Sequence, residues 1–158
     1  MLSTARWSSA RLPSPAISLL MCFKGGTILT YPSIVVRSLR VLIVEDDVDL
    51  RRMFRQALTF VGFDVHQAGD GLEALELLDR EVFDAVILDL WLPGLDGHVV
   101  SQELSAQAHT RQIPVIVVTG QPGPHEELEV ACVLRKPVST ERLIHTVRSC
   151  IASGGNVV

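Results

Sequence analysis

Four short runs of apolar residues in this chain each end in polar residues. Val and Ile dominate these runs, which is typical of strands buried on both faces of a parallel sheet. The first three runs end in Glu45-Asp46-Asp47, Asp89 and Thr119, and the fourth in Lys136. Because ligands bind outside the carboxyl ends of parallel strands, we expect these groups to share one crevice. Carboxylates, a hydroxyl and an ammonium together suit metal-dependent phosphoryl chemistry.

One further short run resembles a strand. Segments whose apolar residues recur at helical spacing separate all five runs. Strands are predicted at residues 39–44, 63–68, 84–89, 113–119 and 132–135. Helices are predicted to begin near Asp49, Asp70, Asp96 and Ser139, with a very short one at 125–131. Parallel strands need such crossovers, which are right-handed. We therefore expect an α/β fold with a doubly wound, five-stranded parallel sheet, order 2-1-3-4-5, and a shortened fourth helix.

The start of the chain differs in composition from the rest. Residues 1–38 are rich in Ser and Pro, contain no Asp or Glu, and show no sustained period. We expect a disordered extension, with a transit peptide or a signal peptide as alternatives. Its longest apolar stretch, 16–23, is too short to span a bilayer. Residues 39–152 are expected to form one domain, followed by a flexible tail over 153–158.

Charge and cysteine content narrow the functional classes. From Glu45 onward, eighteen acids face nine Lys and Arg residues, a net charge of about -9. This acidic body argues against direct nucleic-acid binding, which usually needs a basic face. The three cysteines, Cys22, Cys132 and Cys150, form no CxxC pair. Reduced thiols in a cytoplasmic protein are therefore favoured over disulfides or a zinc site.

Over about residues 39–152 the chain resembles the receiver domain of two-component response regulators. The motifs that carry the resemblance are Leu42-Ile43-Val44-Glu45-Asp46-Asp47, Val86-Ile87-Leu88-Asp89-Leu90 with Pro93-Gly94 and Asp96-Gly97, Val117-Val118-Thr119-Gly120, and Lys136-Pro137. Each motif alone is weak, but all four occur in the right order at the right strand ends. The resemblance implies a flavodoxin-like receiver fold.

The resemblance also implies a role for each acid. Asp89 becomes the phospho-acceptor, because a carboxylate can attack phosphorus and hold the phosphoryl group as a mixed anhydride. Asp46 and Asp89 would bind Mg²⁺ directly, Glu45 through water, and Trp91 through its backbone carbonyl. Clustered carboxylates repel one another unless a cation neutralises them, and Mg²⁺ suits such ligands. Asp47 is expected to start the following helix instead.

Thr119 and Lys136 are implied to contact the phosphoryl group. Lys136 is one of only two lysines, against twelve arginines, and a compact ammonium suits a point-charge contact. By the same resemblance, the bond to Pro137 is expected to be cis.

The chain departs from the receiver pattern at three places. Val133 stands where the family usually carries a switch aromatic, so an inward swing of a ring cannot be the readout. The connection from Thr119 to Lys136 is several residues shorter than usual. The bulky Trp91 stands where side chains screen the phosphoryl group from water, and Gln121 shares that zone. We expect slow self-dephosphorylation, unless Trp91 simply packs on a neighbour.

The sequence thus predicts a single-domain phospho-acceptor rather than an enzyme. A histidine kinase or histidine phosphotransfer protein would be the donor, and an unknown output protein would bind a monomer or weak dimer. A relay or phosphate-sink role is equally compatible, and no membrane association is expected. A phosphorylation-independent docking module is an alternative. An Asp-nucleophile phosphatase is disfavoured by Trp91 at the position of its second acid, and a flavin binder by the acids after the first strand.

Overall fold

The computed structural model describes residues 23–24, 27–28, 37–120 and 128–154. The chain divides into two units, residues 1–37 and 38–158. In the first unit, β1 (Phe23–Lys24) and β2 (Thr27–Ile28) pair antiparallel, which the sequence pattern does not predict. The rest of the expected disordered extension up to residue 36, and residues 155–158 of the expected tail, lie outside the described residues. Among the described helices, none is both long and apolar enough to cross a bilayer.

The second unit is built on the predicted parallel sheet. Its strands are β3 (Arg40–Val44), β4 (Asp64–Ala68), β5 (Ala85–Leu88), β6 (Val115–Thr119) and β7 (Cys132–Arg135). Every neighbouring pair is parallel, in the order β4-β3-β5-β6-β7. Numbered within this unit, that order is 2-1-3-4-5, so the predicted topology is confirmed.

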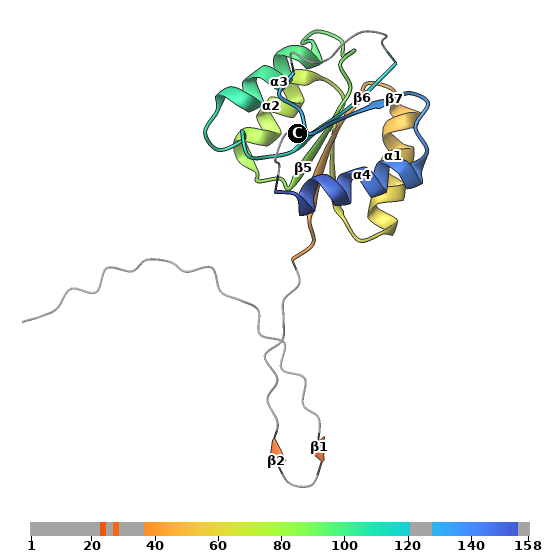
Figure 1. Ribbon diagram of the computed structural model, residues 1–158, viewed down its shortest axis with the longest axis vertical. Coiled ribbons are helices and arrows are strands. Elements are labelled where there is room, and N and C mark those ends of the chain that lie inside the picture. The colour runs from red at the N-terminus through yellow and green to blue at the C-terminus, as the bar shows by residue number, and fades with distance from the viewer. Residues whose placement is uncertain (1–22, 25–26, 29–36, 121–127, 155–158) are drawn as a thin grey trace, which may run out of the picture. The chain divides into compact units, whose positions relative to one another are not determined.

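Two layers of helices cover the sheet, as Figure 1 shows. Helices α1 (Val48–Phe60) and α4 (Thr140–Ala152) lie on one face, and α2 (Gly71–Arg80) and α3 (Gly97–Ala106) on the other. Alternate strand residues belong to the two cores: Leu42 and Val44 pack with α2 and α3, whereas Val41 and Ile43 pack with α1 and α4. Because both faces are buried, the strands are continuously apolar.

The four described helices begin at polar caps. Asp47, Asp70, Asp96 and Ser139 each accept a backbone N–H of the first helical turn through a side-chain oxygen, which satisfies donors that the helix leaves unpaired. In the first turn of α2, the Glu73 side chain reaches back and accepts the N–H of Gly69, at 2.7 Å.

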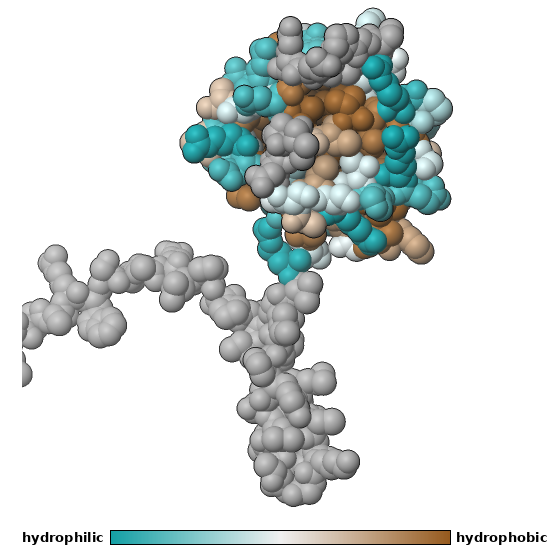
Figure 2. Space-filling view, viewed as in Figure 1, coloured by the Kyte–Doolittle hydropathy of each residue, from teal (hydrophilic) through white to brown (hydrophobic). Residues whose placement is uncertain are grey.

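The described part of the segment 125–131 is not helical, so that part of the prediction is wrong. Residues 125–127 lie outside the described residues, and residues 128–131 contain no helical turn. Leu128 and Val130 instead pack against the core under α2 and α3, and a segment this short gains too few hydrogen bonds to nucleate a helix. Figure 2 shows hydrophobic side chains at the surface in the middle of the side turned to the viewer, between the helices of the two layers.

Candidate functional site

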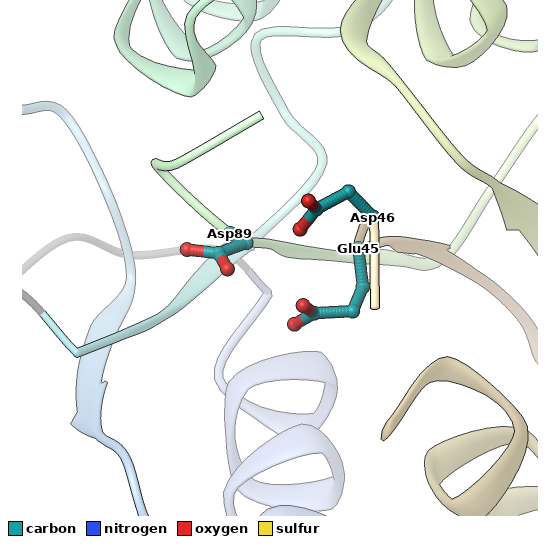
Figure 3. Close-up of side chains that lie close together, drawn as sticks. All are labelled: Glu45, Asp46 and Asp89. Atoms are coloured by element: carbon teal, nitrogen blue, oxygen red, sulfur yellow. The ribbon is translucent and has the colours of Figure 1, made fainter. Parts of the chain in front are cut away.

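The three acids of the candidate site lie at the carboxyl ends of two adjacent central strands. Glu45 and Asp46 follow β3, and Asp89 follows β5. Backbone hydrogen bonds hold these positions, since the Glu45 N–H donates to Ala68 O at 3.2 Å and the Asp89 N–H to Val44 O at 2.9 Å. One carboxylate oxygen from each acid lies within 4.8 Å of the others. Figure 3 shows the three side chains together, with Asp46 directed toward Asp89.

Two of these carboxyl groups are removed from water. Glu45 is 2% exposed and Asp89 is 5% exposed, whereas Asp46 is exposed. Burial raises the pKa of Glu45 although a hydrogen bond from Lys136 opposes that effect. The nearby charge of Asp89 acts in the same direction as burial, so the charged form of Glu45 is less favoured here than in water.

Lys136 joins the two buried acids. Its Nζ donates to Glu45 Oε2 at 2.7 Å and to Asp89 Oδ2 at 2.6 Å. Burial alone would lower the pKa of Lys136, but the hydrogen bonds to Asp89 and Glu45 outweigh it and the pKa is raised. The backbone N–H of Lys136 donates to Thr119 O at 3.0 Å, and the Lys136–Pro137 peptide bond is cis, as the resemblance implied.

The remaining predicted site residues occupy different environments. Thr119, the last residue of β6, is fully buried. Trp91 is 68% exposed, and its backbone N–H donates to Asp89 Oδ1 at 3.1 Å. Val133 is half-buried and packs against the core under α2 and α3. Gln121 lies outside the described residues.

Asp47, the third acid after β3, takes part in the helix rather than in the acid cluster. Its Oδ1 accepts the N–H groups of Asp49 and Leu50, each at 2.9 Å. The hydrogen bond from Leu50 is the main reason that the pKa of Asp47 is lowered. The prediction that Asp47 starts the helix is confirmed.

Two residues near the site have contacts that the sequence analysis missed. The Arg51 guanidinium donates to the backbone carbonyls of Glu45 and Asp46. Gly97 lies so close to the backbone after β5 that a Cβ there would stand 2.3 Å from Asp89 O. A glycine beside a strand end can indicate such an approach, but the pattern does not distinguish Arg51 from the neighbouring Arg52.

The donor set fits a hard divalent cation. Three carboxylates face one ammonium, and two of the carboxylates are buried. Carboxylate oxygens, together with water and carbonyl groups, are the ligands that Mg²⁺ takes in proteins. Asp46 is exposed, which suits Mg²⁺ because this ion keeps several of its waters when it binds to proteins.

This fold and cluster match a known family. A family model for the response regulator receiver domain matches residues 41–148. The chain belongs to this family, whose members act in two-component signalling and are phospho-acceptors rather than true enzymes; receiver domains interact with histidine kinases.

Individual relatives agree with this assignment. The chain is 34% identical to the response regulator MprA of Mycobacterium leprae (strain TN) over 72% of its own length and 51% of that protein. It therefore spans about half the length of the curated relatives it matches. A CheY-like receiver domain protein from Methanospirillum hungatei JF-1 has the same fold (TM-score 0.71, 23% identity), with 75% of this chain and 97% of that one covered.

A third relative bears on the acid cluster. It is the receiver domain of sensor histidine kinase PA1611 from Pseudomonas aeruginosa PAO1, with a TM-score of 0.69 and 26% identity over 73% of this chain and 99% of that one. Its structure holds a magnesium ion coordinated in the active site cleft.

Proposed function

We propose that this chain accepts a phosphoryl group on Asp89 in a two-component or phosphorelay system. The observation that carries the proposal is the pairing of a buried acceptor carboxylate with Lys136, beside two further acids. Asp46 and Asp89 would hold Mg²⁺ directly, with Glu45 acting through water and Trp91 through its carbonyl. The ion would supply charge neutralisation for phosphoryl transfer.

The residues of the chain orient the acceptor from two sides. Lys136 holds Oδ2 of Asp89, and the Trp91 N–H holds Oδ1. In the transfer, an Asp89 oxygen forms a bond to phosphorus while the bond from phosphorus to a donor histidine nitrogen breaks. Lys136 and the hydroxyl of Thr119 would then contact the phosphoryl oxygens. Apart from the bond that Asp89 itself forms to phosphorus, such transfers depend on positioning and on neutralised charge.

The donor is proposed to be a phosphohistidine on a histidine kinase or phosphotransfer protein. Output would pass through protein contacts to a partner, because the new charge on Asp89 shifts the chain between two conformational populations. Since Val133 offers no ring, the readout must use other side chains.

We propose that Asp89 loses its phosphoryl group slowly. Trp91 is exposed beside the acceptor, where its bulk can hinder an attacking water. Trp91→Asn is expected to speed loss of the phosphoryl group severalfold, measured by intact mass over time. An unchanged decay rate would remove this role from Trp91.

Phosphorylation by a small phosphodonor tests the proposed function. The purified protein is treated with acetyl phosphate, with and without Mg²⁺, and its intact mass is measured. One phosphoryl group is expected with Mg²⁺ and none after Asp89→Asn. Asp47→Asn is the matched control, because an Asn also caps a helix and Asp47 lies outside the acid cluster. No gain by the folded wild-type protein would favour the phosphorylation-independent docking module instead.

A further inference from the structure

Beyond the acids themselves, the loop that presents them is contacted by the side chain of Arg51. Glu45 and Asp46 are the first residues after β3, and α1 begins at Val48. Their two carbonyl groups therefore fall between the strand and the helix. A buried carbonyl without a partner is costly, and Glu45 is 2% exposed.

Arg51 supplies the donors for this turn. Its Nη1 donates to Glu45 O and, at 3.2 Å, to Asp46 O. Its own backbone N–H donates to Asp47 O at 2.9 Å, so the side chain reaches back from the first turns of α1. The guanidinium also lies beside Gly69, since a Cβ there would stand 3.7 Å from both Nη atoms.

We infer that Arg51 is a positioning residue that sets Glu45 and Asp46 for the divalent cation. Groups that orient metal ligands influence affinity strongly although they do not touch the ion. One guanidinium that contacts two successive carbonyls fixes the direction of both side chains, which a flexible loop would not. This inference rests on the proposed function, because it assigns Arg51 a part in the same site.

The direction in which the Mg²⁺ affinity changes distinguishes a positioning role of Arg51 from an effect of its charge. Removing a cation beside three carboxylates raises their attraction for Mg²⁺ by Coulomb's law. A pure charge effect therefore predicts tighter binding after Arg51→Met. Loss of positioning predicts weaker binding. A structural role in stability alone predicts no change in affinity while the protein stays folded.

The test measures Mg²⁺ affinity through the fluorescence of Trp91. Trp7 is the other tryptophan, so all variants carry Trp7→Phe. Arg51→Met, Arg51→Lys and Arg52→Met are compared at a temperature where circular dichroism shows each to be folded. Arg52→Met is the matched control, because it removes the same charge from the next residue, whose side chain is exposed and pairs with Asp49 at 3.9 Å.

We expect Arg51→Met to weaken Mg²⁺ binding about tenfold, Arg51→Lys to weaken it less, and Arg52→Met to leave it unchanged. An unchanged or tighter affinity for Arg51→Met would overturn the inference, as would an equal loss in Arg52→Met. If Arg51→Met does not fold, Arg51→Lys decides, and an unchanged affinity there rejects the role. Absence of Mg²⁺ binding by the parent protein would reject the metal site itself, and the role of Arg51 with it.

Discussion

Two polar clusters lie at opposite edges of the sheet, and they differ in how their charges are satisfied. At the carboxyl edge, Lys136 pairs with Glu45 and Asp89, whose side chains are only 3% and 6% exposed. At the amino edge, Arg40 pairs with Asp64 and Glu81, whose side chains are 51% and 31% exposed. Both clusters contain more carboxylates than cations, so the number of charges does not distinguish them.

Burial distinguishes the two clusters. Water solvates the acids at the amino edge, and surface ion pairs of that kind add little energy. At the carboxyl edge, water cannot solvate Glu45 and Asp89, and one ammonium serves both. We therefore expect a cation site where negative charge is buried and the cations of the protein neutralise it incompletely. By this criterion the acid cluster is the candidate site and the amino edge is structural.

The contacts of Arg40 support its structural role. Its guanidinium donates to Glu81, lies 2.9 Å from His66 Nε2, and stacks 5.2 Å from the centre of the Phe83 ring. These partners join β3, the edge strand β4 and the connection into β5. The cluster therefore links the outer strand β4 to the neighbouring parts of the chain.

The largest effect is expected from removing Lys136. Lys136→Met leaves Glu45 and Asp89 buried without their cation, so the free energy of unfolding at pH 7 should fall by about 3 kcal/mol. Because Mg²⁺ can replace the lost charge, adding it should restore part of this loss. Denaturant unfolding with and without Mg²⁺ measures both effects. A loss of unfolding free energy no larger than that of Arg52→Met would contradict the claim that the buried acids depend on Lys136.

The same pair predicts an alkaline pH dependence. The folded protein raises the pKa of Lys136 above its ordinary value of 10.5. Stabilisation by the pair is therefore complete below pH 10.5 and is lost as the pH rises through the folded-state pKa. The difference in unfolding free energy between the wild type and Lys136→Met should stay constant from pH 7 to 10 and shrink above it. A constant difference at all pH values would be inconsistent with this pairing.

A smaller effect is expected at the amino edge. Arg40→Met should lower the unfolding free energy by about 1 kcal/mol, because its partners are partly solvated. Adding Mg²⁺ should not reduce this loss, since no buried anion is left behind. Unfolding titrations under the conditions used for Lys136→Met give the comparison. A rescue by Mg²⁺ would show that this cluster also binds cations.

Much of this arrangement follows from local patterns in the sequence. Buried parallel strands are continuously apolar, which makes β3, β5 and β6 easy to recognise, and Asp70, Asp96 and Ser139 stand at helix starts as capping rules predict. The acids and Lys136 could be brought together because strand ends of a parallel sheet share one edge. The prediction of the site therefore follows from the parallel direction of the strands.

What could not be predicted depends on contacts between distant residues or on weak local signals. The apolar residues Leu128 and Val130 suit a helix as well as an extended segment, and their packing against the core favours the extended one. The exposure of Trp91 depends on its surroundings in the folded chain. Nothing in the spacing separates Arg51 from Arg52, although only the first contacts the carbonyls of Glu45 and Asp46.

The central claim is that a divalent cation binds at the buried acids of the carboxyl edge and not at the solvated amino edge. Mn²⁺ takes the oxygen ligands that Mg²⁺ takes, and it broadens nearby amide signals in nuclear magnetic resonance spectra. With substoichiometric Mn²⁺ added to ¹⁵N-labelled protein, we predict selective loss of the signals of residues 45–47, 89–91 and 136, and recovery with excess Mg²⁺. Broadening centred on Arg40, Asp64 and Glu81, or no selective broadening, would contradict the account.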